Sequence, residues 1–590
     1  MLILDTECYT NYWLISFLSV DTGKIRSFEL HDDQPLDVRT VSGLMRKYTT
    51  ISFNGLSYDL PMITAALSGW NNLKLKALSD SIIKSKLPSY RICNDAGINT
   101  PTAWDHIDLI EVAPGMSGLK IYGGRLNAPK MQDLPIAPDA RIADCERELM
   151  REYCDNDLHT TKLLYDTLKP QIALRVSMSA QYGLDLRSKS DAQIAETVIC
   201  SELAKETGKK YKKPDIQDGE TFRYLDPQIV TFQRDDLREI FKRLTAERFT
   251  LGANGSVNMP DWLKNQKIRI GSTEYQMGIG GLHSCEKSQY VRAAENTLLF
   301  DMDVAGYYPS IILQQRLAPK SMGAPFLRVY QSIVTRRLKA KREGDKVTAD
   351  TLKICVNGSF GKLGSKYSAL YAPDLLIQTT ITGQLALLML IERIESAGAK
   401  IISANTDGIV VHCPKALEPA VMVIAWDWEL ETSYELERTD YAAIASRDVN
   451  NYVAVKLDGK TKGKGVFAPT GLAKNPDGTI VFAAVSAYIA KGTPIEKTIR
   501  DCADVRQFLT IRKVTGGATW RGAYLGKAVR FYYSTSVRQD ECIHYKTNSN
   551  RVPNSAGAMP LMELPDKMPD DVDFSVYIVA AEKLLCEVGA

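Results

Sequence analysis

The chain has 590 residues, 45% of them hydrophobic, and 73 basic against 70 acidic residues give a formal net charge of +3. This length and hydrophobic content suffice for three or four domains with real cores, and the nearly balanced charge identifies no class of partner. The eleven cysteines are scattered, odd in number and free of any C-x-x-C pair. They argue against both a disulfide framework and a zinc or iron–sulfur module, so we expect reduced core cysteines.

No apolar segment approaches the roughly 18 to 20 residues that are needed to span a bilayer. The longest, residues 385–391, predicts a buried helix, so we expect no membrane partner. The first residues carry acidic side chains where a signal peptide would carry basic ones. We therefore expect a protein of the cytoplasm.

Carboxylates recur in the first 160 residues in three patterns. Asp5 and Glu7 lie on one side of a predicted strand, because strand side chains alternate with period two, and they repel unless a cation lies between them. Asp59 follows an asparagine by five residues, and Tyr153 and Asp157 are spaced i, i+4 on a predicted helix. The alternative, unrelated surface acids, is weakened because each acid has the strand or helix context that a site needs.

These patterns resemble the D-x-E, N-x-x-x-(F/Y)-D and Y-x-x-x-D motifs of the 3'–5' exonuclease domain of proofreading polymerases. The resemblance implies two-metal hydrolysis of a phosphodiester, with cations about 4 Å apart that hold the phosphate and activate a water. Asp5, Glu7 and Asp157 would be direct metal ligands. Asp59 would hold the second metal and Tyr153 would orient the water.

The middle region, residues 169–297, gives weaker signals. The stretch 206–218 contains four lysines and is predicted to be a loop or linker that either contacts a phosphate backbone or faces water. Gly280 and Gly281 predict a tight turn, for which a plain hairpin turn is the alternative to a binding role.

An apolar run at residues 298–300 predicts a buried strand that carries Asp301 and Asp303 to its end, before a turn at Gly306. A carboxylate at such a position is costly unless something positive meets it. That partner is either a basic side chain or a divalent metal with oxygen ligands. Asp301 and Asp303 point the same way, so the strand pattern alone does not choose between them.

The pattern next predicts a helix over residues 326–342, a turn at 343–345 and a second helix from 347 to 361. Residues 335–366 include nine basic and three acidic side chains. Such a block is most often a solvated helix face, but beside metal-type carboxylates it favours a polyphosphate partner.

Cations of this predicted hairpin fall on defined helix faces. Arg337 and Lys341 share a face of the first helix, and Lys353 and Asn357 share a face of the second, because residues at i and i+4 are neighbours. Equally basic neighbours, Arg336 and Lys339, leave the assignment of the first-helix cations open.

Two strand pairs follow. Residues 400–413 predict strands folded back through a turn that holds Asp407 at its tip. Residues 448–467 alternate like a second pair, with Tyr452 before the turn and Lys462 and Lys464 after it. The final region mixes helical stretches with basic turns, and its last helix is expected to begin after an Asp573 N-cap.

The strand carboxylate, basic helix and hairpin carboxylate, in this order, resemble the polymerase motifs of the family B DNA polymerases. Residues 303–310 match D-x-x-S-L-Y-P-S, residues 353–361 match K-x-x-x-N-S-x-Y-G, and residues 405–408 match D-T-D-S. The departures are Gly306, Gly358 and Gly408 for serines, Tyr307 for a leucine, Phe360 for a tyrosine, and Asn405 for the first aspartate of the third motif.

This resemblance implies a template-directed DNA polymerase in which Asp303 and Asp407 hold two Mg²⁺ ions, for which Mn²⁺ can substitute. The spacing to Tyr308 favours Asp303 over its neighbour, and Asn405 is expected to weaken metal affinity without abolishing activity. Tyr308 would stack under the sugar and reject a 2'-hydroxyl, or else is an ordinary core aromatic. Further implied residues are Ala305 and Gly306 (phosphate cradle), Arg337, Lys341, Lys353 and Asn357 (triphosphate), and Gly280, Gly281, Tyr452, Lys462 and Lys464 (DNA).

The implied fold class is a multidomain α+β protein, with an RNase H-like exonuclease domain followed by a right-hand polymerase of palm, fingers and thumb. The large insertions of protein-primed members have no room here, so protein priming is not implied. The expected limits are 1–170 for the exonuclease, 171–290 for a linker and template-contacting region, 291–325 and 363–470 for the palm, 326–362 for the fingers and 471–590 for the thumb.

The expected partners are primer–template DNA, dNTPs and a single-stranded 3' end, bound by a monomer. By resemblance only, the compact size and the lack of cysteine-rich C-terminal modules lead us to expect a virus-encoded replicase from a bacteriophage, acting in the host cytoplasm. Two rival hypotheses stay open: an exonuclease whose polymerase half is degenerate, and a primer–template-binding protein without catalysis. The exonuclease would degrade a primer but never extend it, and the binding protein would be indifferent to chelators and to loss of Asp303.

Overall fold

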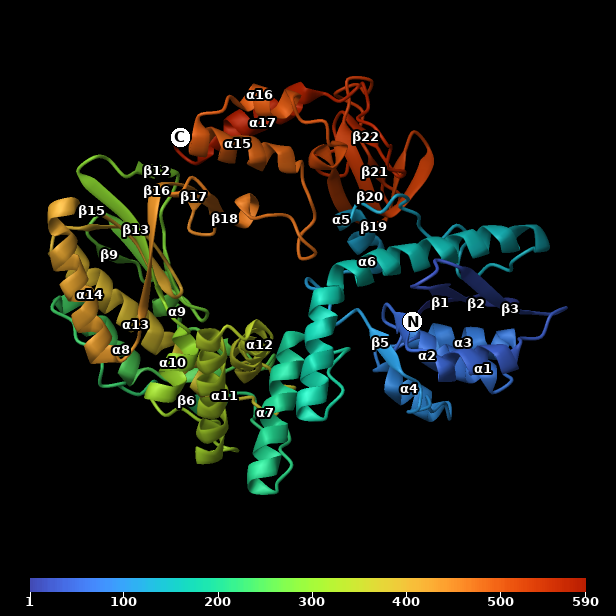
Figure 1. Ribbon diagram of the computed structural model, residues 1–590, viewed down its shortest axis with the longest axis horizontal. Helices are drawn as coiled ribbons and strands as arrows, with labels where there is room; N and C mark the ends of the chain where they lie inside the picture. The colour runs from blue at the N-terminus through green and yellow to red at the C-terminus, as the bar shows by residue number, and fades with distance from the viewer. The chain divides into compact units, whose positions relative to one another are not determined.

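The computed structural model describes residues 1–590 and is a mixed α+β protein, as expected (Figure 1). The chain forms two compact units. Unit 1 consists of Met1–Ser190, Thr470–Ile480 and Arg500–Tyr577, and unit 2 of Asp191–Pro469, Val481–Ile499 and Ile578–Ala590.

Unit 1 is built on a five-stranded sheet in which β1 lies at the centre. β1 is antiparallel to β2 and parallel to β4, and β4 is parallel to β5. Helices α1 to α3 cover one face and α6 the other, so the apolar side chains of β1 and β2 are buried on both sides (Figure 1). The strand order is β3 (Ile25–His31), β2 (Tyr12–Ser19), β1 (Leu2–Cys8), β4 (Thr50–Ser52) and β5 (His106–Asp108).

The helices of unit 1 include one that crosses an expected domain limit. α6 (Arg147–Tyr182) runs for 36 residues and continues through Pro170. Unit 1 therefore extends beyond the limit expected at residue 170, because a continuous helix leaves no linker there. The other helices before it are α1 (Val38–Lys47), α2 (Asp59–Leu67), α3 (Asn72–Lys84), α4 (Ser89–Asp95) and α5 (Leu119–Arg125).

A second sheet of unit 1 comes from the C-terminal part of the chain. This C-terminal sheet has the order β21 (His544–Tyr545), β19 (Thr510–Trp520), β20 (Ala523–Tyr533) and β22 (Ala558–Pro560). The sequence led us to expect helical stretches and basic turns here, but the long strands β19 and β20 pair with each other and bury alternating apolar side chains. The expected continuous region 471–590 is instead divided between the two units.

Unit 2 is built on a ten-stranded sheet with β13 and β15 paired near its middle. Its path is β18 (Thr461–Lys464), β17 (Asn451–Lys456), β16 (Leu436–Asp448), β13 (Thr297–Val304), β15 (Gly408–Pro414), β14 (Lys400–Asn405), β11 (Leu282–Ser284), β10 (Thr273–Met277) and β9 (Ile268–Ile270), and β12 (Gln289–Arg292) pairs with β16. A small separate sheet contains β6 (Thr221–Phe222), β7 (Phe249–Leu251) and β8 (Val257–Asn258).

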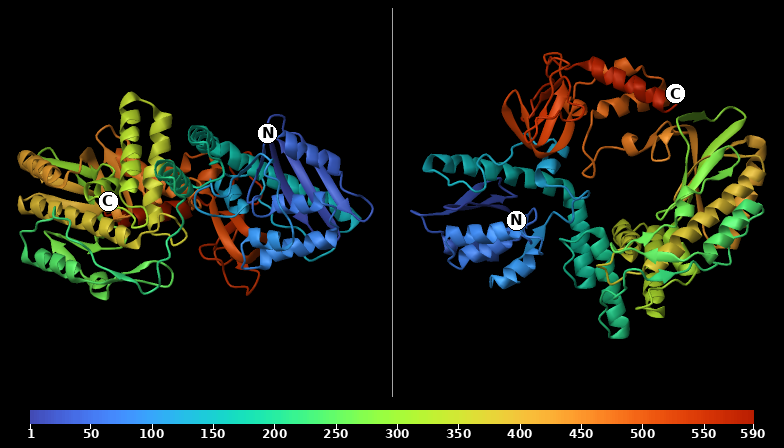
Figure 2. Two further views of the ribbon diagram at one scale, coloured as in Figure 1. Left: turned by 90° about the horizontal axis from the view of Figure 1, so that it is seen from below. Right: turned by 180° about the vertical axis from the view of Figure 1, so that it is seen from behind.

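Helices α13 (Pro373–Ser396) and α14 (Glu418–Thr432) cover one face of the long sheet (Figure 2). We expected no apolar segment long enough for a membrane, but α13 passes that test by length and composition because polar threonines and glutamines interrupt its apolar runs only briefly. Most of this apolar window, 89%, is buried inside the protein, which identifies α13 as a core helix and confirms the buried helix expected at residues 385–391.

The expected helical hairpin is present as α11 (Ala324–Glu343) and α12 (Lys346–Leu363). Gly344 ends the first helix in a left-handed conformation, and the Asp345 side chain accepts a hydrogen bond from the Thr348 amide and so caps the second. Both helices pack against α7 (Asp191–Thr207). The remaining helices are α8 (Asp235–Ala246), α9 (Asp261–Asn265), α10 (Tyr307–Gln314), α15 (Thr479–Lys491), α16 (Ile495–Arg500) and α17 (Phe574–Glu587).

Candidate active sites

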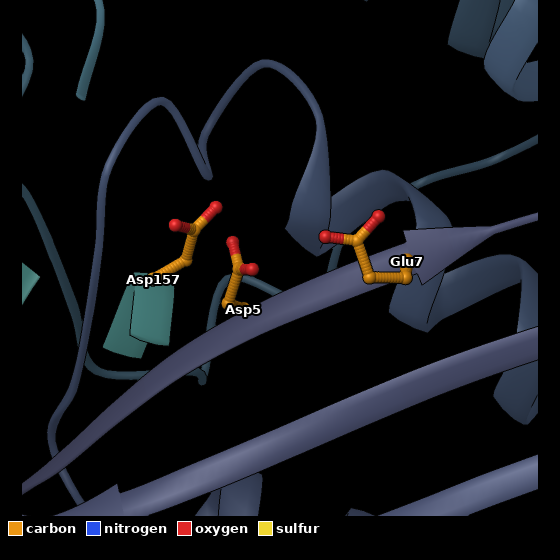
Figure 3. A group of neighbouring side chains, drawn as sticks. All are labelled: Asp5, Glu7 and Asp157. Carbon is orange, nitrogen blue, oxygen red and sulfur yellow. The ribbon is translucent and has the colours of Figure 1, made fainter. Parts of the chain in front are cut away.

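The carboxylates of Asp5, Glu7 and Asp157 form one cluster in unit 1. Ligand atoms of the three side chains all lie within 4.8 Å of one another. Figure 3 shows Asp5 and Glu7 rising from β1 while Asp157 approaches from α6. The structure thus brings together the three residues that the sequence analysis proposed as direct metal ligands.

Asp59 lies beside this cluster at the start of α2. Its carboxylate accepts a hydrogen bond of 2.6 Å from the Thr6 hydroxyl, which fixes it against β1. Burial raises the pKa of Asp5 well above its usual value, and the charges of Asp59 and Asp157 add to the shift. Asp59 is therefore a neighbour of the cluster rather than one of its three closest members.

The loop before Asp59 depends on an acid that the sequence analysis missed. Asp108, at the end of β5, accepts hydrogen bonds from the backbone amides of Asn54 and Leu56 at 2.8 and 3.0 Å. Asn54 has a positive φ of 69°, so the carboxylate stabilises a turn that few residues adopt. Asp108 gave no motif signal because its partners lie more than 50 residues away in the chain.

Lys120 is the second residue that sequence reasoning missed. Its ammonium contacts the Asp157 carboxylate directly and lies 4.3 Å from the centroid of the Tyr153 ring. Tyr153 thereby joins the cluster as expected from its spacing to Asp157. Asp59 and Asp157 are buried and Asp5 and Glu7 are half-buried. One lysine cannot balance these four carboxylates, so their charges repel one another.

The crowding and burial of these carboxylates raise the pKa values of the cluster. Burial, followed by the charge of Asp157, raises the pKa of Glu7 to about 8. Burial raises the pKa of Asp59 to about 7, although the Thr6 hydrogen bond opposes the shift. A set of converging carboxylate oxygens fits a hard divalent cation such as Mg²⁺, which would remove the mutual repulsion.

We expect Mg²⁺ to raise the unfolding temperature more at about pH 8.5 than at about pH 6, because protons held by Glu7 and Asp59 compete with the metal at the lower pH. Differential scanning fluorimetry with Mg²⁺ and with a chelator at both values measures this. The part of the Mg²⁺-induced shift in unfolding temperature that comes from the unit 1 cluster is the part that is lost when Asp5 and Glu7 are both replaced by alanine. An identical Mg²⁺ shift in that variant would contradict metal binding at this cluster.

The second site lies in unit 2, where β13 and β15 pair antiparallel. Asp303 on β13 lies opposite Gly408, and the Val304 amide donates a 2.7 Å hydrogen bond to the Asp407 carbonyl. A Cβ on Gly408 would lie 2.0 Å from an Asp303 carboxylate oxygen, so a side chain at position 408 would require the Asp303 carboxylate to move. Burial, with the charges of Asp301 and Asp407, raises the pKa of Asp303 to about 6 although Lys462 opposes it. The two acids named by the motifs are thus neighbours.

Asp301 and Asp303 have different surroundings, which separates their roles. Asp301 is only 6% exposed and accepts hydrogen bonds from the Tyr441 hydroxyl at 3.0 Å and the Lys462 ammonium at 3.2 Å. The Asp303 side chain is 45% exposed, and its contact with Lys462 is longer, 3.8 Å. Asp301 is therefore already paired, which leaves Asp303 as the more accessible carboxylate.

Lys462 and Lys464 were expected to bind DNA. The structure places both lysines beside the carboxylates of the second site. The Lys462 ammonium lies between Asp301 and Asp303. Lys464 pairs with Tyr452 across β17 and β18 and is close enough to Asp407 for its charge to oppose the burial that raises the pKa of Asp407. Asp407 itself forms no ion pair with a lysine or arginine.

The expected glycine pair lies against the turn that carries Asp407. The Gly278 amide donates to the Gly281 carbonyl at 3.1 Å, which closes the predicted tight turn, and a Cβ on Gly281 would lie 2.9 Å from Thr406. The Tyr308 hydroxyl donates a 2.5 Å hydrogen bond to the Gly280 carbonyl. These contacts connect the glycine turn to both sequence motifs around the carboxylates.

Tyr308 also joins the basic helix α12 to this site. Its ring stacks on Phe360 with centroids 4.1 Å apart. Lys353 and Asn357 are exposed and share the helix face of Phe360, so they lie on the side of α12 that meets Tyr308. Lys341 on α11 forms a 3.5 Å ion pair with Glu437 at the end of β16.

Two departures from the motifs have packing reasons. A Cβ on Gly358 would already lie 2.7 Å from the Asp191 carbonyl on α7, so a serine does not fit there without movement. The Asn405 amide donates a 2.9 Å hydrogen bond to the Val449 carbonyl, which an ionised aspartate is unable to do. Of the cations left open on α11, Arg336 has buried guanidinium nitrogens and points into the helix packing, unlike Lys339.

Comparisons with known proteins give limited similarity. No protein-family model matches the chain. DNA polymerase 1 of Sulfolobus acidocaldarius is 26% identical over 124 residues, which are 21% of this chain and 14% of that protein. A solved family B DNA polymerase from Pyrobaculum calidifontis aligns with 100% of this chain and 77% of that chain, with 13% identity and a TM-score of 0.43.

Proposed function

We propose that the chain is a template-directed DNA polymerase of the family B type that also carries a 3'–5' exonuclease. The single observation that supports this most is the meeting of Asp303 and Asp407 across β13 and β15, beside a basic helix that contacts Tyr308 through Phe360. Three sequence motifs that lie far apart in the chain thereby converge on one carboxylate site.

In the proposed polymerase site, Asp303 and Asp407 would hold two Mg²⁺ ions, with Mn²⁺ as a substitute. Bound there, the metals supply activation of the primer 3'-hydroxyl and neutralisation of the leaving pyrophosphate. The chain itself would hold the reactants in line. The Gly306 amide would cradle phosphate, whereas the Ala305 amide that was expected to act with it already donates a 2.8 Å hydrogen bond to the Glu435 carbonyl. Lys462 would keep the Asp303 carboxylate oriented. Triphosphate contacts would come from Arg337, Lys341, Lys353 and Asn357.

In the proposed exonuclease site, Asp5, Glu7 and Asp157 would be the direct metal ligands, with Asp59 for the second ion. Tyr153 would orient the attacking water. Lys120 would hold Asp157 in place and offset part of its charge. Bound metals supply the activated water and the stabilisation of the leaving 3'-oxygen.

The partners follow from the reaction. We propose that a monomer binds primer–template DNA, dNTPs and a single-stranded 3' end, with the palm and fingers assignments as stated from the sequence. The thumb expected over residues 471–590 does not stay one region, because these residues are divided between the two units. DNA contacts would come from Gly280, Gly281, Tyr452, Lys462 and Lys464. Origin in a bacteriophage and action in the host cytoplasm stay predictions.

A primer-extension assay with a 5'-labelled primer tests this function. With Mg²⁺ and dNTPs the primer should lengthen, and without dNTPs it should shorten from its 3' end. Shortening without any extension would favour the exonuclease with a degenerate polymerase half. Binding that is equal in Mg²⁺ and in chelator, with neither reaction, would favour the non-catalytic binding protein.

Tyr308→Ala should raise ribonucleotide incorporation by about 10- to 100-fold, because the ring that is held by Gly280 and Phe360 would no longer exclude a 2'-hydroxyl. Single-nucleotide insertion with dNTPs and rNTPs measures the ratio. Tyr308→Phe is the matched control, since it keeps the ring and should retain the preference. An unchanged ratio in the alanine variant would refute the steric role.

A further inference from the structure

Arg530 on β20 is the most completely buried charged side chain of the C-terminal sheet. It is 0% exposed and has no carboxylate partner. Its guanidinium donates instead to backbone carbonyls, at 2.7 Å to Leu561 and Ala128, 3.2 Å to Met562 and 3.3 Å to Pro129. Burial lowers the pKa of Arg530 to about 10. Burying an unpaired charge costs free energy, and these four hydrogen bonds offset part of that cost. They also join the segment around Ala128 and Pro129 to the segment around Leu561 and Met562.

One of these segments, residues 128–134, is called the docking strand below; it is an extended segment with one isolated bridge, at Lys130, and is not one of the numbered strands. The Met131 amide donates to the Met562 carbonyl and the Leu564 amide to the Pro129 carbonyl, both at 2.7 Å. With the antiparallel bridge between Lys130 and Glu563, these bonds pair the docking strand with residues 562–564. Arg530 thus lies at a junction between the N-terminal and C-terminal parts of unit 1.

The same sheet supports the helix that carries Lys120. On α5, Ile121 packs with Met131 and with Ile511 of β19. A Cβ on Gly124 would lie 3.0 Å from Ile511, so helix and strand are in close contact. The sheet therefore fixes α5, whose Lys120 contacts Asp157.

The docking strand also carries an acid toward the candidate nuclease site. Asp133 lines a cavity together with Lys120 and Asn156. Its carboxylate accepts hydrogen bonds from the Tyr524 hydroxyl at 2.7 Å and the Lys527 amide at 3.2 Å, both on β20. These bonds hold the Asp133 carboxylate against β20, in the cavity that Lys120 also lines.

We propose that the C-terminal sheet is a working part of the candidate nuclease, and that Arg530 and Tyr524 are positioning residues that hold Lys120 against Asp157 through α5 and the docking strand. This inference rests on the proposed exonuclease function.

Arg530→Met in the full chain should lower kcat for degradation of a single-stranded oligonucleotide by about 10- to 100-fold with little change in KM, because displaced catalytic groups lose alignment. Arg530→Lys should recover part of the rate. Hydrogen exchange of the Met131 and Leu564 amides should speed up in Arg530→Met. Extension with saturating dNTPs should stay near wild type, as should both activities in the control Arg538→Met, whose side chain is 81% exposed.

If Arg530→Met does not fold, Tyr524→Phe still tests whether the C-terminal sheet positions Lys120. Tyr524 is 43% exposed, so loss of its hydroxyl should leave folding intact while Asp133 is released toward Lys120. We expect a fall in kcat of about threefold or more, and none for Tyr90→Phe, a 60% exposed tyrosine elsewhere in unit 1.

If Arg530→Met and Tyr524→Phe both degrade DNA at the wild-type rate, this inference is overturned, while the proposed exonuclease function is unaffected. A wild-type chain that does not degrade DNA would overturn the proposed exonuclease and this inference with it. Faster exchange of the Met131 and Leu564 amides in Arg530→Met, with an unchanged rate of degradation, would show that Arg530 only stabilises the structure. That result would also contradict a role of Arg530 in positioning Lys120.

Discussion

Asp303→Asn should lower the rate of primer extension by about 10³-fold, because the amide keeps the shape of the side chain but loses the charge that holds a divalent cation. Asp303 is partly exposed and lies beside Asp407, so the variant should fold normally. Single-turnover extension of a 5'-labelled primer with saturating dNTPs measures the rate. Degradation of the same primer without dNTPs should continue.

Two further variants make this result specific. Asp458→Asn changes an exposed acid in the turn between β17 and β18 and should extend at the wild-type rate. Asp301→Asn should be less damaging than Asp303→Asn, since Asp301 is already paired with Lys462 and Tyr441. The reverse order of effects would exchange the roles of Asp301 and Asp303, and normal extension in both would contradict the proposed polymerase site.

Asp5→Ala combined with Glu7→Ala should reduce 3'–5' degradation by at least about 10³-fold, since two of the three clustered carboxylates proposed to hold the metal disappear. Primer extension should persist at a rate close to wild type, because the polymerase carboxylates belong to unit 2. The measurement is loss of single nucleotides from a labelled single strand in Mg²⁺ without dNTPs.

The matched control removes the same two charges from the surface of unit 1. Asp32 and Asp33 are exposed after β3, so Asp32→Ala with Asp33→Ala should leave both reactions unchanged. Loss of extension in the Asp5 and Glu7 variant would show that the two reactions had been assigned to the wrong sites.

Local periodicity in the sequence predicted the parts of both sites that one strand, helix or turn creates. Alternation along β1 placed Asp5 and Glu7 on one side, and the i, i+4 spacing on α6 placed Tyr153 near Asp157. The hairpin α11–α12 and the turn at Asp407 were predicted within a few residues for the same reason. Such features depend only on the geometry of neighbouring residues.

These local patterns do not predict contacts between segments that lie far apart in the sequence. Lys120 lies 37 residues from Asp157 and carries no motif. The position of Lys462 between Asp301 and Asp303 depends on three successive pairings among the four strands β13, β16, β17 and β18. The C-terminal sheet was missed because β19 and β20 contain glycines and charged residues that weaken the strand pattern.

By itself, then, the sequence determined which acids, helices and turns exist and the order in which they occur. Tertiary structure alone decided that Asp301 is paired while Asp303 is accessible, and that Arg530 joins segments 402 residues apart. The physical reason is that side-chain periodicity acts within a single element, whereas burial and charge pairing depend on which elements pack together.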